Sequence, residues 1–228
     1  MHHGCMRIRS SLVNDAATSG RAQRRQDARG TARRTVRDRL GGPGGNEILT
    51  SATAVVLTGL LVAEGVTIVD MHPLLTAHMF IGTTLIAPVL LKLASTGYRA
   101  GRYYAGSSAY RAKGPPLLPL RLLAPVLAAT TIAVLMTGVL LLAAGHKSDT
   151  LLLIHKVSFF AWGAVFAVHF LAYLPRVIRS MGVDWTAAGR EAVPGAGVRG
   201  MVVAAAVGGG AALALALLPA MTAWHGGH

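Results

Sequence analysis

Three histidines lie within long apolar segments of the chain, where polar side chains are costly and are therefore candidates for function. They are His78, His155 and His169. The last two are 14 residues apart, which on an α-helix is about 40° short of four full turns and about 21 Å along the axis. Both imidazoles would thus share one helix face, one near each side of a bilayer. Because neutral imidazole is an axial ligand of haem iron, this spacing is typical of a helix that carries two stacked haems.

His78 lies in a different apolar segment, at a depth that matches His155 if both segments cross the membrane in the same direction. We therefore expect these two imidazoles to bind one iron, that of a haem b, between neighbouring helices. The residue 14 positions after His78 is Lys92, so the inner pair of Lys92 and His169 is incomplete. Lys92 ligates iron only when deprotonated, and otherwise reaches lipid headgroups, an acid or a haem propionate. The sequence predicts one haem and leaves a second open.

Five further residues could assist such a cofactor. Lys156 could reach a propionate or the lipid headgroups. Arg99 and Arg102 follow the segment of His78 and could bind propionates or a soluble reductant, or simply anchor the chain at the membrane surface. Gly82 and Gly163 lie near the histidines, where a missing side chain leaves room for a flat macrocycle or allows close helix packing.

The elements that must position these residues are five apolar stretches, each long enough to cross a bilayer as a helix. They are residues 48–69, 73–91, 122–145, 150–174 and 201–224. Glu64 is the only acid within them, and it could serve a proton path for quinol oxidation or a helix–helix hydrogen bond. Charged residues make up 14% of the chain, against about 25% in soluble domains. We predict an all-α polytopic membrane protein with five transmembrane helices, the first four forming a haem-binding bundle.

The first 47 residues are rich in Arg, Ser, Thr, Gly and Ala and contain no aromatic residue. We predict a flexible basic tail over residues 1–47 and a membrane bundle over 48–225. Of the 22 Lys and Arg residues, 19 lie in this tail and in two loops on the same side of the bundle. By the positive-inside rule, we expect the N-terminus to be cytoplasmic and the C-terminus extracellular, with the chain in the plasma membrane. The net charge of +13 then reflects topology and attraction to anionic lipid, and we expect no nucleic-acid partner.

Two stretches of the chain carry a family resemblance. They are HMFIGTTLIAPVLLKLASTGYRAGRYYAGSSAYRAKGPP, residues 78–116, and LLLIHKVSFFAWGAVFAVHFLAYL, residues 151–174. Together with the 14-residue histidine spacing, they resemble transmembrane b-type cytochromes, including ferric-reductase-like bundles. More narrowly, they are similar to actinobacterial integral membrane proteins described as cytochrome b-like. The resemblance covers the second to fourth segments and implies a haem-binding electron-transfer bundle, while Lys92 departs from the two-haem pattern.

These observations favour a membrane b-type cytochrome that transfers single electrons through haem held between the second and fourth helices. Such a chain could be the electron-transfer subunit of a membrane oxidoreductase. It has no nucleotide-binding signature, so its electrons would come from a redox partner protein or a quinol. One alternative is a haem-free anchor or scaffold subunit of a larger complex or oligomer. Another is a small-solute or metal transporter that uses Glu64, Lys92 and the histidines as a polar pathway.

Overall fold

The computed structural model describes residues 42–112, 114, 118–186, 193 and 195–224. Most of the predicted basic tail lies outside these residues. Within them, the chain forms five long helices and one short one, with no strand. These are α3 (Gly42–Val69), α4 (Met71–Tyr104), α5 (Ser108–Arg111), α6 (Leu118–Ala144), α7 (Asp149–Trp185) and α9 (Ala196–Ala223). The five long helices are long and apolar enough to cross a membrane, so the prediction of an all-α polytopic membrane protein is confirmed.

The helices extend beyond the apolar stretches that predicted them. Helix α3 begins at Gly42 rather than at residue 48, and α7 continues to Trp185 rather than ending at residue 174. The first turns of α3 pack against α4. Asn46 is buried there, and its Nδ2 donates to the carbonyl oxygen of Ser95 on α4, at 3.2 Å. Helical hydrogen bonding satisfies the backbone whether or not the side chains are apolar, so hydropathy alone underestimates helix length.

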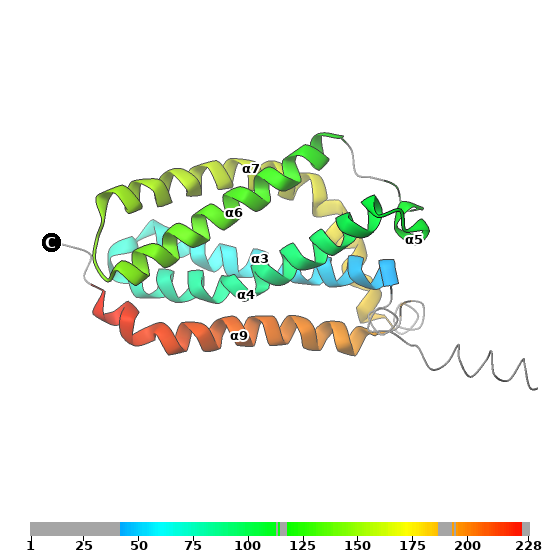
Figure 1. Ribbon diagram of the computed structural model, residues 1–228. Helices are drawn as coiled ribbons and strands as arrows, with labels where there is room; N and C mark the ends of the chain where they lie inside the picture. The colour runs from blue at the N-terminus through cyan, green and yellow to red at the C-terminus, as the bar shows by residue number, and fades with distance from the viewer. Residues whose placement is uncertain (1–41, 113, 115–117, 187–192, 194, 225–228) are drawn as a thin grey trace, which may run out of the picture. The chain divides into compact units, whose positions relative to one another are not determined.

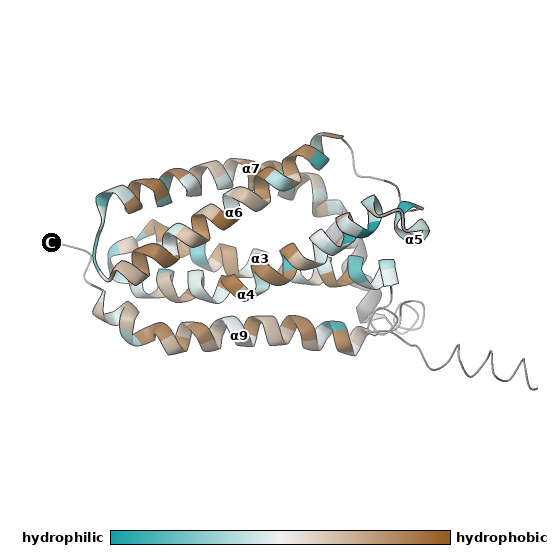
Figure 2. Cartoon of the chain, viewed as in Figure 1, coloured by the Kyte–Doolittle hydropathy of each residue, from teal (hydrophilic) through white to brown (hydrophobic). Residues whose placement is uncertain are grey.

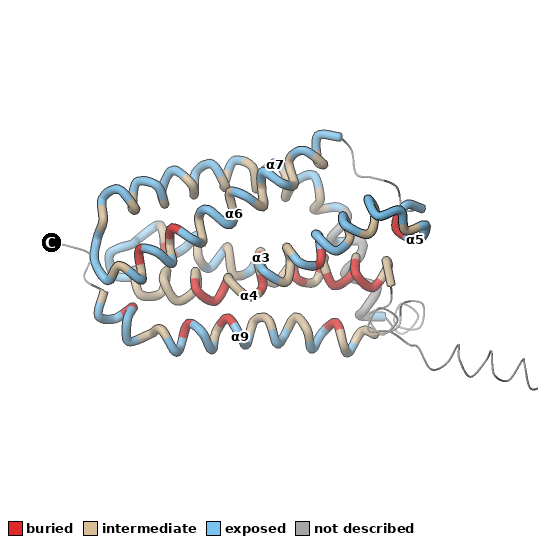
Figure 3. Tube along the Cα trace, viewed as in Figure 1, coloured by how far each residue is buried: buried red, intermediate tan, exposed pale blue. Residues whose placement is uncertain are grey.

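The long helices pack in two groups. Helix α4 packs along both α3 and α9, whereas α6 packs along α7. In Figure 1 the α6–α7 pair runs beside the other three helices, and Figure 3 shows that most buried segments belong to α3, α4 and α9. Helices α9 and α4 approach closely, since a Cβ on Gly210 would overlap the backbone carbonyl of Thr84. Small residues of this kind allow membrane helices to approach backbone to backbone.

The two ends of the bundle differ in charge. At the end that we call the basic end, α3, α6 and α9 begin and α4 and α7 end. Its described arginines include Arg99, Arg102, Arg111, Arg121 and Arg199. At the opposite end, the far end, the chain turns from α3 into α4 and from α6 into α7. Figure 2 shows hydrophobic residues along the helices and hydrophilic ones gathered toward both ends.

The outward face of the bundle is apolar. Large hydrophobic side chains are exposed on every long helix, among them Val62, Leu90, Leu122, Leu171 and Leu215. In water such a surface would drive aggregation, whereas in a bilayer it contacts acyl chains. The exposed face therefore supports contact with membrane lipid.

A large cavity lies between the two groups of helices. It has a volume of about 1470 Å³ and is lined by α3, α4, α6 and α7, with Tyr110 of α5 and Trp224 at its ends. None of its lining residues comes from α9. The four helices that the sequence assigned to the core bundle therefore surround the cavity, and α9 packs outside it.

Candidate functional site

His78 of α4 and His155 of α7 meet across the cavity near the far end. Their ring centroids are 6.4 Å apart and the ring planes are inclined by 82°. Both residues line the cavity. The structure therefore brings together the two histidines that we expected, from the sequence, to lie at the same depth on neighbouring helices.

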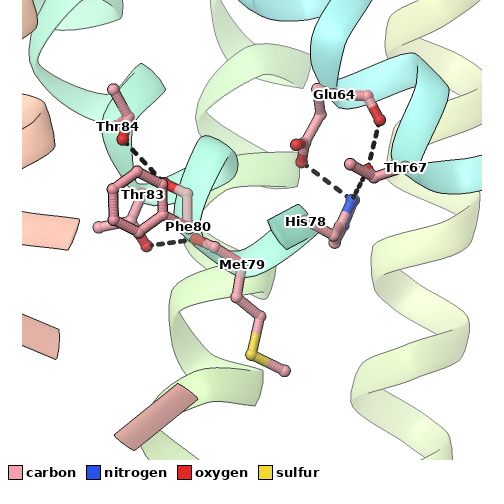
Figure 4. Close-up of polar contacts among 7 residues, drawn as sticks. All are labelled: Glu64, Thr67, His78, Met79, Phe80, Thr83 and Thr84. Atoms are coloured by element: carbon pink, nitrogen blue, oxygen red, sulfur yellow. Dashed lines mark hydrogen bonds and ion pairs between the residues drawn. The ribbon is translucent and has the colours of Figure 1, made fainter. Parts of the chain in front are cut away.

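The His78 ring is held by two side chains of α3, which Figure 4 shows on one side of the ring. Its Nδ1 lies 3.0 Å from Oε1 of Glu64 and 3.0 Å from Oγ1 of Thr67. The Thr67 hydroxyl already donates to the carbonyl oxygen of Glu64, at 2.5 Å. Its oxygen is therefore an acceptor toward the ring, and Nδ1 of His78 is assigned as the protonated nitrogen. This tautomer leaves a lone pair on Nε2.

The His155 ring is held in the same way by α6. Its Nδ1 lies 2.9 Å from Oγ1 of Thr137. The Thr137 hydroxyl donates within its own helix, to the carbonyl oxygens of Ala133 at 2.8 Å and Val134 at 3.0 Å. The hydroxyl oxygen therefore accepts from Nδ1, and Nε2 of His155 again carries the lone pair. Among the described residues, no hydrogen bond engages Nε2 of either ring.

Glycines near the two rings have unequal roles. A Cβ on Gly138 would lie 3.3 Å from Cε1 of His155, so this glycine makes room for the ring. A Cβ on Gly82 would lie 3.2 Å from Oε1 of Glu64, so Gly82 accommodates the carboxylate rather than a macrocycle face. Gly163 has no atom within 4 Å of its Cβ position.

The separation of the two rings fits a metal ion between two imidazoles. With metal–nitrogen bonds of about 2.0 Å, imidazoles on opposite sides of one ion have ring centroids about 6 Å apart. The observed 6.4 Å matches this separation. Metal-binding histidines usually donate their second N–H to a carboxylate, carbonyl or other oxygen, as both rings do here. The donor set and the cavity therefore suit a haem.

A second polar region of the cavity lies toward the basic end. Lys92 of α4 and His169 of α7 both line it, and they are within electrostatic reach of each other. Lys92 is turned toward α3, where Nζ donates to the carbonyl oxygen of Thr50 at 2.7 Å. His169 stacks on Tyr173, with ring centroids 4.6 Å apart. Its Nδ1 is buried and has no hydrogen-bond partner in the described structure.

The basic residues expected to assist a cofactor are dispersed. Lys156 and Arg99 line the cavity. Arg102 does not; its Nη2 lies 3.4 Å from Oγ of Ser107, and its buried Nε has no partner among the described residues. Lys156 is exposed, so both the headgroup and the propionate interpretations of this side chain stay open.

Within the described ranges, no three His, Cys, Asp or Glu side chains come together as a metal site. A haem needs only an axial pair, because the macrocycle supplies the other four ligands. Comparison with protein-family models, with curated proteins and with solved structures finds no match for this chain. The likeness to transmembrane b-type cytochromes therefore stays a prediction from the residues that carry it.

Thr67, Thr137 and Gly138 were not singled out from the sequence. Each acts on a histidine of another helix, so no spacing along one helix could have found it. The available signal was weaker: threonine in a membrane span is a common hydrogen-bond partner between helices. Glu64 was singled out, and the structure supports its helix–helix hydrogen bond, with His78 as the partner.

Proposed function

We propose that this chain is a membrane b-type cytochrome that transfers single electrons through a haem b held between α4 and α7. His78 and His155 would hold its iron. The observation that carries the proposal is the 6.4 Å ring separation together with the matching Nδ1 hydrogen bonds on both rings. When bound, the haem would supply a reversible one-electron couple.

The remaining residues of the site prepare the two imidazoles. Thr137 fixes the orientation and tautomer of His155 from α6, while Glu64 and Thr67 do the same for His78 from α3. A carboxylate that accepts from Nδ1–H also increases electron donation by the opposite nitrogen, so His78 would be the stronger ligand. The apolar cavity wall keeps water away and thereby sets the polarity that tunes a redox potential.

The proposal places the chain in the plasma membrane with the basic end in the cytoplasm. The arginines of the basic end support this orientation, since the described far end carries Lys147 and Lys156 alone among basic residues apart from histidine. The histidine pair would then lie near the outer surface. Electrons would be exchanged with a redox partner protein or with a quinol.

Pyridine haemochrome quantification on purified protein tests the proposal. We expect about one haem b per chain and a reduced-minus-oxidised b-type spectrum. His78→Ala and His155→Ala should each lose this haem. His72→Ala is the matched control, because His72 is exposed and lies outside the cavity lining.

Colourless protein from haem-replete cells would overturn the proposal and favour a haem-free anchor subunit. Retention of the full spectrum in both alanine variants would overturn the ligand assignment while leaving a haem elsewhere. Metal-dependent growth of a deletion strain, with colourless protein, would instead favour transport.

A further inference from the structure

The basic-end half of the cavity is not accounted for by the histidine pair. Ligand pockets for small molecules are usually about 300–1,000 Å³, and the cavity here measures about 1470 Å³. We call its unexplained part the basic-end chamber and define it by lining residues on three helices. They are Thr50, Lys92, Trp162, Phe166, His169 and Phe170.

One wall of the chamber is a series of aromatic rings on α7. Trp162 and Phe166 are stacked, with centroids 4.8 Å apart and planes inclined by 18°. Phe166 and Phe170 are stacked with centroids 5.6 Å apart and an inclination of 27°. All three line the cavity. Aromatic rings favour offset-stacked and edge-to-face contacts, so this wall offers a planar ligand such contacts without demanding polar groups.

The polar groups of the chamber have unused hydrogen-bonding capacity. An ammonium has three N–H bonds. Among the described residues, Nζ of Lys92 donates one hydrogen bond, to the carbonyl oxygen of Thr50. The nearby imidazole of His169 has a buried Nδ1 without a partner in the same part of the chain. Buried polar groups left unpaired are costly in an apolar environment. Lys92 therefore suits a ligand that accepts hydrogen bonds, and His169 offers the same ligand a second polar contact as donor or acceptor, according to its tautomer.

The chamber fits an oxygen acceptor better than a second haem. Lys92 occupies the position, 14 residues after His78, where a second axial imidazole would lie. Its nitrogen instead points to α3 and donates to a backbone carbonyl. The ammonium of Lys92 must lose a proton before its nitrogen can ligate iron, whereas its remaining N–H groups can donate to a ligand without any change of protonation.

We propose that the basic-end chamber binds a lipid-soluble quinone or its quinol. The ring lies against Trp162, Phe166 and Phe170, one ring oxygen accepts a hydrogen bond from Lys92, and His169 binds a polar edge of the same ligand. A quinone combines the needed properties, since it is planar, dissolves in the bilayer and carries only oxygen acceptors. Its redox role rests on the proposed function, but its binding does not.

Binding of a short-chain naphthoquinone to the full chain in nanodiscs tests this proposal. We expect saturable binding of one molecule per chain, detected by isothermal titration with apoprotein and with haem-loaded protein. Lys92→Met removes a charge-assisted hydrogen bond and should weaken binding about tenfold or more. Lys147→Met is the matched control, because Lys147 is a lysine of the far end, paired with Asp149 at 3.6 Å, and should leave the affinity unchanged.

A second variant keeps the test decisive if Lys92→Met does not fold. Ala54 lines the cavity one helical turn from Thr50, and Ala54→Phe should fill the chamber and abolish quinone binding while leaving helix content unchanged.

The proposal would be overturned if the native protein shows no saturable binding. It would also be overturned if every variant that folds binds quinone with the native affinity. Two haems per chain, one of them lost in His169→Phe, would assign the chamber to a second haem instead. A chain without any haem that still binds quinone through Lys92 would overturn the proposed function alone.

Discussion

Replacing Thr137 by valine tests whether the cavity-facing histidines are prepared as ligands. The substitution keeps the shape of the side chain and removes the oxygen that accepts from Nδ1 of His155, at 2.9 Å. That oxygen is the only side-chain partner of Nδ1 among the described residues, and the backbone carbonyl of Val134 also interacts with the ring. The variant therefore deprives a partly buried N–H of its side-chain acceptor, and it removes the contact that fixes both the ring orientation and the tautomer.

The expected loss follows from the chemistry of that single hydrogen bond. Leaving a buried donor unsatisfied costs about 1–3 kcal/mol, which corresponds to about 5- to 150-fold in an equilibrium constant. Loss of an outer partner of a metal-binding histidine typically costs about 10- to 100-fold in affinity. We therefore expect haem affinity to fall at least about fivefold in Thr137→Val, measured by haemin titration of apoprotein and by transfer of haem to an acceptor protein.

Thr130→Val is the matched control for this experiment. Thr130 lies on the same helix and donates to the carbonyl oxygens of Val126 and Leu127, but it contacts no histidine. Its replacement should keep haem affinity within about twofold of the native value, because substitutions away from the site usually change the free energy by about 0.5 kcal/mol or less. Equal behaviour of the two variants, both retaining native affinity, would refute the assignment of Thr137 as a positioning residue for an axial ligand.

Two further predictions concern glycines. Gly138→Ala places a Cβ 3.3 Å from Cε1 of His155, so the ring must shift and haem content, measured by absorbance, should fall. Gly163→Ala, whose Cβ meets no atom within 4 Å, should retain native haem content in the same assay. Gly210→Ala would drive a Cβ into the facing backbone of α4, and overpacking should lower the free energy of unfolding by about 1–3 kcal/mol. Gly208→Ala, with open space at its Cβ position, is the comparison in detergent-denaturation experiments, and equal stability of the two would contradict the close helix contact.

The sequence was sufficient for the parts of the molecule that depend on one helix at a time. Hydropathy predicts the five spans, and the spacing of His155 and His169 predicts that one face of α7 carries both. Parallel crossing directions then predict that His78 lies level with His155. Each of these conclusions uses helix geometry and bilayer thickness, which are nearly independent of tertiary packing.

Features that depend on how helices are rotated against each other were not accessible in this way. Thr137 meets His155 from α6, and Glu64 meets His78 from α3. Gly82 was expected to make space for a macrocycle or to allow close helix packing, but its space is taken by the carboxylate of Glu64. The rotation of each helix about its axis follows from the summed packing of many side chains. The spacing of residues along one helix therefore does not determine which residues of a neighbouring helix they contact.

The pairing of α9 with α4 has a consequence for biosynthesis. Helix α4 follows α3 along the chain, yet one of its faces is covered by the helix synthesised after α6 and α7. The surface of α4 around Thr84, which Gly210 of α9 contacts, must therefore face lipid until α9 has been translated and inserted. Most of the cavity wall needs no such delay, because the lining comes from the chain before α9 except for Trp224, which follows that helix. Ligand capture can thus precede the final docking step, and a chain truncated before α9 would keep the cavity lining apart from Trp224 while exposing the α4 surface to membrane quality control.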